Sequence, residues 1–376
     1  MTAWSANADP RHDGRQRSLL SLVLLVAALA IVLAALHLAA AVVSPFLLAM
    51  VLALIFWPLL VWLRGRGLGT LPSLLVLFVG LIVGATVIAL VIGSGVSGMA
   101  ARMDTYTQGL SEQLQSLDAW FASHGLTDVN LAAALSPDTI KALFSAFASS
   151  LTSALYQGFI ILLMLLFFLV EGRAVVDRIR QSLDANDPNP ARLAKFGGDV
   201  GQYFALRAAV NAITGAGVTL VLWLLGVDFP LLWGVLTFFL SFIPYIGMFL
   251  ASVPSVLLAW AEFDLAHAVV VGLALTAVNA SAENLVQPAL MHKGLNLSPT
   301  FVFLSVFFWG WLLPGGGSFL AIPISLGLLA ILANYPATNW FVHAVTTAPV
   351  GAQPADTASS TDPDRTPVSP GFRPDT

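Results

Sequence analysis

Cysteine is absent from the 376 residues of the chain, and charged residues are scarce, at 10% of the total. The absence of cysteine excludes disulfide bonds, thiolate metal sites and cysteine nucleophiles. A soluble domain carries roughly a quarter charged residues, whereas 58% of this chain is hydrophobic. The composition therefore predicts an all-α polytopic membrane protein. The net charge of −4 is too small to indicate nucleic acid as a partner.

Catalytic motifs are also missing. The glycines Gly315 to Gly317 are not followed by a phosphate-binding lysine, and the pattern GxxxxGK[ST] does not occur. GxSxG and HExxH are absent too, and histidines and acids do not cluster at metal-ligand spacing. These absences predict that the protein is not an enzyme and uses no metal or cofactor. Without an ATP site, transport would draw on an ion gradient or on the substrate's own gradient.

Long apolar runs predict about eight membrane segments. They comprise three helices within 18–96, one within 151–171, and a helix followed by a broken segment within both 203–262 and 265–335. The dipeptide Ser44–Pro45 predicts the boundary between the first two helices. The polar tails, residues 1–17 and 340–376, are expected to be disordered.

Charge orients these segments in the membrane. Arginines precede the first helix, follow the second and recur in the loop 172–202, which predicts that these parts and both termini are cytoplasmic. The charged residues within 97–150 are mostly acids, and apolar residues between Met103 and Phe121 recur at helical spacing. We expect a small extracytoplasmic helical region there, which either packs on its own membrane helices or binds a partner.

The stretch from Leu231 to Trp260 cannot form one plain helix. Unbroken, it would run roughly 45 Å, against a hydrocarbon core of about 30 Å. Pro244 lacks an N–H group and Gly247 is conformationally permissive, so we expect non-helical backbone between them. Such backbone is tolerated at membrane depth only where protein or a watery cavity meets it. In transporters, broken segments of this kind build the substrate site.

A second broken stretch, residues 300–334, repeats features of the first about seventy residues further along the chain. Both units contain an Ala-Val-Asn-Ala tetrapeptide, a Phe-Phe pair, a proline at the break and a glycine-led apolar run. The corresponding positions are Asn211 and Asn279, Phe238 and Phe307, Pro244 and Pro314, and Gly247 and Gly317. This ordered series predicts an internal repeat.

Two topologies of the repeat are open. If each broken segment crosses the membrane, the repeats are parallel and Lys293 lies outside. If each enters and returns as a re-entrant hairpin, the repeats are inverted, with Glu262 and Asp264 outside and Lys293 inside. The positive-inside rule favours the hairpins.

Several motifs together resemble one known family. They are FFLVEGR (167–173), LLGVDFPLLWGVL (224–236), FIPYIG (242–247), ENLVQP (283–288) and LLPGGGSFLAIP (312–323). With them, the chain is similar to the autoinducer-2 exporter family of PerM-like permeases from about residue 18 to 335. The resemblance implies an eight-segment permease of the bacterial inner membrane and a homo-oligomer, with a pentamer as one form to expect. The family includes exporters of a signalling molecule and cation/proton antiporters, so the resemblance leaves the cargo open.

Polar groups at membrane depth are costly and mark candidate pathway residues. Glu283 could bind a cation or a proton, or it could be a structural acid paired with Arg207. Asn211 and Asn279 could contact cargo or bridge helices. The substrate or ion pathway is expected to comprise Arg207, Asn211, Ser241, Pro244, Gly247, Asn279, Glu283, Asn284, Gln287, Pro314, Gly315, Gly316 and Gly317.

The leading functional hypothesis is a permease in the lipid bilayer that exports a small polar or amphipathic molecule by alternating access. One alternative is a sodium/proton antiporter, in which Glu283 would be indispensable. The other is a membrane scaffold or sensor that acts through the extracytoplasmic helical region. That last hypothesis predicts that deletion of residues 100–148 abolishes function while the broken segments tolerate substitution.

Overall fold

The computed structural model describes residues 10–125, 136–182, 189–290, 297–333, 335–336 and 338–346. Within these ranges the regular structure is helical, with one isolated β-bridge between Leu297 and Thr346. Most of the C-terminal tail expected to be disordered, residues 347–376, lies outside the described residues. The expected all-α architecture is confirmed for the described part of the chain.

Three helices form the N-terminal part: α1 (Pro10–Leu38), α2 (Ala40–Gly65) and α3 (Thr70–Ala101). Helix α1 already begins inside the segment 1–17, so the disorder expected there is wrong for residues 10–17. The boundary expected at Ser44–Pro45 is also wrong, because α1 ends at Leu38 and Pro45 lies inside α2. A proline removes one helical hydrogen bond, which neighbouring groups in a membrane bundle can replace.

The polar region contains α4 (Met103–Ser123), and α6 (Pro137–Ser182) runs from it through the next apolar run. Ser136 caps α6, since its Oγ accepts a hydrogen bond from the Thr139 N–H at 3.3 Å. Both α6 and α7 (Asn189–Leu224) extend into the region 172–202 that was expected to be a loop. Hydropathy marks the apolar part of a helix, and polar turns can continue it beyond that point.

The first broken stretch is a helical hairpin. Helix α8 (Pro230–Leu240) and helix α9 (Gly247–Glu262) are separated by the non-helical residues 241–246. The two outer ends meet, because the backbone N–H of Asp228 donates to Oε2 of Glu262 at 3.2 Å. Helix α10 (Leu265–Ser281) follows and continues into a π-helical turn, η1 (Ala282–Val286), and into α11 (Gln287–Leu290).

The second broken stretch consists of α12 (Pro299–Leu312) and α13 (Gly317–Leu332), with a bend of 117° between them. A short helix, α14 (Asn339–Val345), then packs back on this pair. The Ser298 N–H donates to the Val345 carbonyl at 2.8 Å. The disorder expected for residues 340–376 is therefore wrong for 340–346. Below, α8–α9 is the first hairpin and α12–α13 the second.

Five helices in the described ranges are long and apolar enough to cross a membrane, or six segments if the second hairpin counts as one. They are Ala40–Gly65, Thr70–Ala101, Pro137–Gly172, Gly197–Leu224 and Leu265–Leu290. The protein is thus polytopic by length and composition. The total of eight segments and the internal repeat stay predictions. Lys293, whose side of the membrane separates the two topologies, lies outside the described residues.

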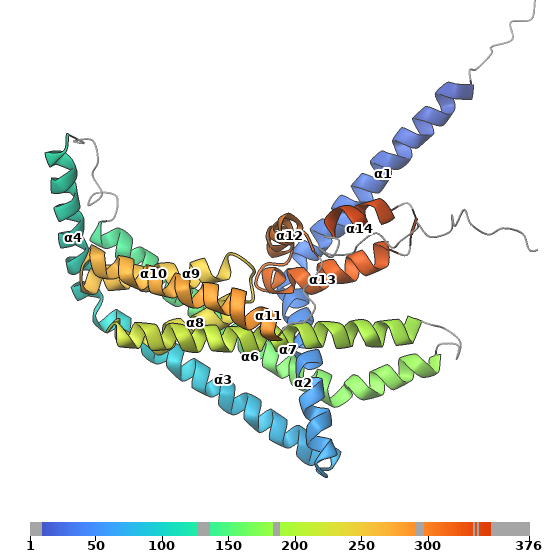
Figure 1. Cartoon of the computed structure of the whole chain (residues 1–376). Helices are drawn as coiled ribbons and strands as arrows, with labels where there is room; N and C mark the ends of the chain where they lie inside the picture. Colours follow the sequence, from blue (N-terminus) through green and yellow to red (C-terminus); the bar gives the residue numbers. More distant parts are fainter. Residues whose placement is uncertain are drawn as a thin grey trace, which may run out of the picture.

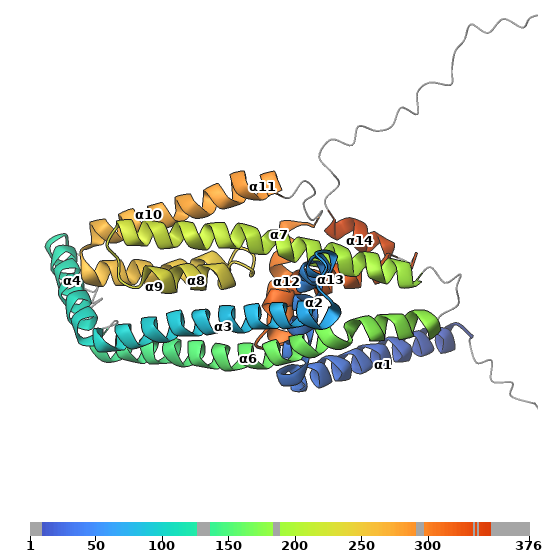
Figure 2. The same ribbon diagram turned by 90° about the horizontal axis from the view of Figure 1, so that it is seen from below.

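Several of the helices run along one common direction. In Figure 2, α3, α6, α7, α10 and the first hairpin run side by side, and α4 stands across one end of them. Helix α1 projects at the opposite end in both views and contacts α2 and α12 (Figure 1). The main core lies under α4, around Trp233, which is fully buried among residues of α3, α7, α8, α9 and α10.

Candidate functional site

A cavity of about 140 Å³ lies between α7, the tip of the first hairpin, and α10 with its π-helical turn. It is lined by Arg207, Val210, Asn211, Thr214, Ser241, Ile243, Tyr245, Met248, Asn279 and Glu283. Five of these were predicted from the sequence as pathway residues: Arg207, Asn211, Ser241, Asn279 and Glu283. The structure brings them together although they lie up to 76 residues apart in the sequence (283 minus 207).

Two buried polar atoms at this cavity have no hydrogen-bond partner, namely Nε of Arg207 and Oγ of Ser241. The other guanidinium nitrogens of Arg207 are used: Nη1 donates to Oε1 of Gln287 at 2.9 Å, and Nη2 to the Ser241 carbonyl at 2.8 Å. Buried polar groups are nearly always paired, so each exception calls for an explanation. A small rearrangement of the cavity wall around a polar ligand would be needed to supply the missing partners.

Arg207 is held between the hairpin tip and α11, where Gln287 begins the last helical turn. No ion pair joins it to Glu283 in the described part of the chain, so the structural pairing considered for these two residues is wrong. Glu283 is exposed at the cavity mouth, within the π-helical turn. Isolated π-helical turns occur frequently at functional sites.

The amides of the two asparagines have different surroundings. Asn211 is 1% exposed, and its Nδ2 donates to the Phe238 carbonyl at 3.2 Å, which ties α7 to α8. Asn279 is half-buried at the cavity wall. Asn284 was predicted as a pathway residue, but its Nδ2 donates to the Ala280 carbonyl of its own helix at 2.8 Å, and it does not line the cavity.

The backbone of the hairpin tip is strained. Tyr245 has φ = +65°, a left-handed conformation that costs a non-glycine residue about 1–3 kcal/mol. It follows Pro244 and lines the cavity with an exposed ring. Gly247 is buried where a Cβ atom would overlap the Leu240 carbonyl oxygen, so the return of the chain requires glycine. No sequence signal marks Tyr245, because the strain follows from the turn around it.

The predicted residues of the second break lie elsewhere. The Pro314 carbonyl accepts a hydrogen bond from Oγ of Ser44 at 3.1 Å, and Gly316 is buried against Leu48 of the same helix, α2. Gly315 packs on Gln157 of α6, and a Cβ at Gly317 would overlap the Trp309 carbonyl. None of these four lines the cavity. The tips of the two hairpins nevertheless meet, because the ring centroids of Phe242 and Phe319 are 6.5 Å apart.

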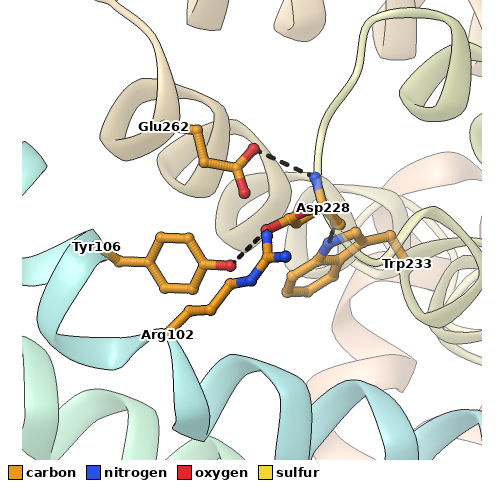
Figure 3. A network of polar contacts seen from close by, with 5 residues as sticks. All are labelled: Arg102, Tyr106, Asp228, Trp233 and Glu262. Atoms are coloured by element: carbon orange, nitrogen blue, oxygen red, sulfur yellow. Dashed lines mark hydrogen bonds and ion pairs between the residues drawn. The ribbon is translucent and has the colours of Figure 1, made fainter.

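A second polar cluster, the base network, lies at the outer end of the first hairpin (Figure 3). It consists of Arg102, Tyr106, Asp228, Trp233 and Glu262. Oδ2 of Asp228 pairs with Nη1 of Arg102 and accepts a hydrogen bond from the Tyr106 hydroxyl at 2.7 Å. The Asp228 carbonyl accepts from Nε1 of Trp233 at 3.1 Å. None of the five network residues was predicted from the sequence as a pathway residue.

The two carboxyl groups of the base network have opposite pKa shifts. Burial, with the neighbouring Asp228, raises the pKa of Glu262 to about 8. Burial also acts to raise the pKa of Asp228, but hydrogen bonds with Tyr106 and Glu262 and the charge of Arg102 outweigh it and lower the pKa. Two adjacent carboxylates disfavour double ionisation, which is consistent with pKa shifts in opposite directions.

Comparisons with known proteins decide the family. The model of the protein family described as "AI-2E family transporter" matches residues 22–337. The chain belongs to the AI-2E family. It is 29% identical over 312 residues to the "AI-2 transport protein TqsA" of Escherichia coli K12, which covers 82% of this chain and 90% of that protein. It is also 26% identical over 306 residues to the "Putative transport protein YhhT" of the same strain, covering 81% and 88%.

A third relative, a "Putative transport protein" of Haemophilus influenzae, is 27% identical over 329 residues, covering 83% of this chain and 92% of that protein. The predicted family resemblance is confirmed. This AI-2E protein is a membrane transporter, and its relatives are transport proteins rather than enzymes. Two of the motifs that suggested the family line the cavity: FIPYIG forms the tip of the first hairpin, and ENLVQP contributes the π-helical turn.

Proposed function

We propose that the protein exports a small polar molecule, which binds in the cavity between α7, the first hairpin and α10. The observation that carries this proposal is the set of polar residues that line one cavity, two of which, Arg207 and Ser241, also hold a buried atom without a hydrogen-bond partner. A membrane protein that left both without a ligand would lose about 1–3 kcal/mol for each. A transporter that must bind and release cargo needs such groups free in its empty state.

The cavity chemistry favours a compact, hydroxyl-rich or zwitterionic cargo. A cation, Arg207, and a carboxyl group, Glu283, face the same space with the amide of Asn279. The volume of about 140 Å³ is below the roughly 300–1,000 Å³ of pockets for drug-sized ligands. The name of one relative, an AI-2 transport protein, supports a signal of this kind as the first cargo to test.

The mechanism we propose is alternating access through movement of the hairpin tips. The left-handed Tyr245 stores strain at the tip that lines the cavity, and strained segments of this kind are found at switch regions. The contact between Phe242 and Phe319 links this tip to the second hairpin. Re-entry of the two hairpins from opposite membrane faces, as an inverted repeat, is part of the proposal.

The bilayer and self-association belong to the proposal as well. Large apolar side chains stand exposed along α1, α3 and α10, including Val23, Ile31, Val87 and Leu273. Exposed apolar surface of this extent indicates contact with lipid or with further subunits. We place the protein in the bacterial inner membrane as a homo-oligomer, a pentamer among its forms, with cytoplasmic termini, in line with the arginine distribution.

A sodium/proton antiporter is the second candidate, favoured by the carboxyl group of Glu283 at the cavity mouth. The two functions separate in proteoliposomes loaded with labelled AI-2 under imposed sodium or proton gradients. AI-2 efflux that persists in Glu283→Gln supports the exporter. Sodium-driven proton movement without AI-2 flux, abolished by Glu283→Gln, supports the antiporter. Absence of both fluxes in folded protein contradicts both functions.

Ser241→Ala tests the cavity directly. If the Ser241 hydroxyl contacts cargo, the initial AI-2 efflux rate falls about tenfold, the equivalent of about 1.4 kcal/mol. Thermal stability stays equal or rises, because an unpartnered buried hydroxyl is removed. The matched control is Ser255→Ala in α9, whose Oγ bonds to the Ser252 carbonyl at 2.9 Å. Unchanged efflux in Ser241→Ala would exclude a cargo contact.

A further inference from the structure

The base of the first hairpin is an interface between three parts of the chain. The network residues come from the junction of α3 and α4 (Arg102), from α4 (Tyr106), from the connection before α8 (Asp228) and from the last residue of α9 (Glu262). Figure 3 shows Arg102 and Tyr106 meeting the carboxyl group of Asp228, and Glu262 meeting its backbone nitrogen. The interface thereby joins α4, the helix that crosses the end of the bundle, to both arms of the hairpin.

Close packing continues this interface along α4 and α9. Gly109 lies against the Ala261 carbonyl so closely that a Cβ atom would overlap it. One turn further, Nε2 of Gln113 donates to the Phe263 carbonyl at 3.1 Å. The end of α9 is therefore held by α4 on one side and by Asp228 on the other. Any force between Glu262 and Asp228 acts directly on the docking of α4.

Glu262 is the incompletely satisfied member of this interface. Its Oε2 accepts the Asp228 N–H, while its Oε1 is buried without a hydrogen-bond partner. Asp228 engages both Arg102 and Tyr106, so the positive charge of Arg102 is already paired. A proton on Glu262 lets the two carboxyl groups share a hydrogen bond. Loss of that proton leaves two anions beside one arginine.

The other ionisable groups near this end have partners of their own. On α10, the Asp264 carboxylate caps the helix by accepting the His267 N–H at 2.7 Å, and Nε2 of His267 contacts the Leu225 carbonyl at 3.0 Å. On α4 and α6, Asp104 pairs with Lys141 at 2.8 Å. Helix α8 carries no ionisable residue. The charge balance of the interface is thus set by Arg102, Tyr106, Asp228 and Glu262.

We propose that the base network is a pH-sensitive latch: α4 is docked on the first hairpin while Glu262 holds a proton, and release of that proton to water undocks it. The proton moves between the Glu262 carboxyl group and solvent at the outer end of the bundle. Once it has left, repulsion between Glu262 and Asp228 separates the end of α9 from the connection before α8. The hairpin base, and with it the tip at the cavity, then gains freedom to move.

The chain's lack of cysteine makes a distance measurement straightforward. Gln115→Cys on α4 and Ala266→Cys on α10 are both exposed positions for nitroxide labels. Pulsed electron spin resonance on the full chain in lipid nanodiscs, from pH 6 to pH 10, reports the distance from α4 to the start of α10, which directly follows the hairpin and serves below as the α4–hairpin distance. We expect one short, narrow distance at pH 6 and a longer, broader distribution above a midpoint near pH 8.

Variants test whether ionisation of Glu262 causes this change in distance. Glu262→Gln, which cannot ionise, should keep the short distance up to pH 10. Asp228→Asn should lower the midpoint by about one unit, because Glu262 loses its anionic neighbour. The control Glu112→Gln, an exposed acid on the same helix, should titrate like the parent. A parent distance that does not change with pH, or a Glu262→Gln protein that titrates like the parent, overturns the proposal.

This latch does not depend on the proposed export function. The distance measurement needs neither cargo nor a gradient, so it can succeed where AI-2 flux fails. Conversely, flux through the cavity could be established while the α4–hairpin distance stays constant, which would reject the latch alone.

Discussion

The two hairpins share their break but differ in what surrounds it. In both, a glycine, Gly247 or Gly317, returns the chain against a carbonyl of the preceding helix, so that a Cβ atom would overlap it. The first tip faces a cavity with unpartnered polar atoms, whereas the Pro314 carbonyl of the second tip is bonded to Ser44 of α2. A similar backbone turn is thus exposed to a ligand in one hairpin and anchored to the N-terminal helices in the other.

The outer ends of the two hairpins also differ in their surroundings. The first hairpin closes through ionisable side chains, with Glu262 bonded to Asp228. At the second, main-chain contacts join the residues before α12 to the end of α14: the Ser298 N–H bonds to the Val345 carbonyl, and a bridge joins Leu297 and Thr346. Main-chain bonds do not titrate. On the proposed function, we therefore expect the first hairpin to be the responsive element and the second its more fixed support.

The largest loss of stability is expected from substitution of the glycine that both hairpins use to return the chain. Gly247→Ala and Gly317→Ala each place a methyl group on a backbone carbonyl. The folded state of either variant should lose more stability than ordinary overpacking costs, which is about 1–3 kcal/mol. The measurement is the yield of monodisperse protein and its unfolding temperature. Gly84→Ala in α3, which meets no atom within 4 Å, is the control. If only one hairpin glycine proves essential, the two breaks are not equivalent.

Arg207 should separate fold from transport. Arg207→Lys keeps the positive charge but loses the planar fork that reaches both Gln287 and the Ser241 carbonyl. We expect the initial efflux rate to fall about tenfold. The protein should remain folded, as checked by its elution profile and unfolding temperature. Gln202→Ala, at an exposed position of the same helix, should transport normally. Normal transport by Arg207→Lys would remove Arg207 from the pathway.

The sequence could predict the breaks and much of the cavity, because both rest on local chemistry. Each break combines a proline, Pro244 or Pro314, with a nearby glycine, which favours non-helical backbone more than a lone proline does. A polar group such as Arg207 is costly in lipid in any fold. The base network could not be predicted this way. Asp228 meets Glu262 across 34 residues and Arg102 across 126, and spacing along the chain carries no signal for such pairs.

Helix ends show the same limit. Pro45 was expected to end a helix, but α2 continues through it while the break falls at Leu38. Extension of α6 to Ser182 was not predicted either, since a polar sequence can stay helical beyond the bilayer. Membrane depth can be estimated from hydropathy, but helix length depends on tertiary neighbours.

The base of the first hairpin should make stability pH-dependent. The pKa of Glu262 is raised from 4.5 to about 8 in the folded protein, so its proton stabilises the fold at low pH. This contribution is lost as pH rises from about 4.5 to about 8. The lowered pKa of Asp228 acts in the opposite direction but only at acidic pH. Above pH 5, the loss of stability that the base network contributes therefore comes from ionisation of Glu262.

Glu262→Gln should remove this decline. We expect the unfolding temperature of the variant in nanodiscs to match the parent at pH 5 and to exceed it by a few degrees at pH 9. Glu112→Gln, in the exposed part of α4, should follow the parent at both pH values. A parent protein whose unfolding temperature is constant from pH 5 to pH 9 would show that the first base is no more titratable than the second.

The smallest effect is expected at the second tip. Ser44→Ala removes the hydrogen bond to the Pro314 carbonyl and should lower stability by about 1 kcal/mol, with unchanged initial efflux. Ser94→Ala in α3 is the control, since its Oγ bonds only to the Val91 carbonyl of its own helix. If Ser44→Ala instead alters the efflux rate at constant stability, the second hairpin moves during transport as well. The contrast between a responsive and a fixed hairpin would then give way to two moving halves that differ only in which one contacts the cargo.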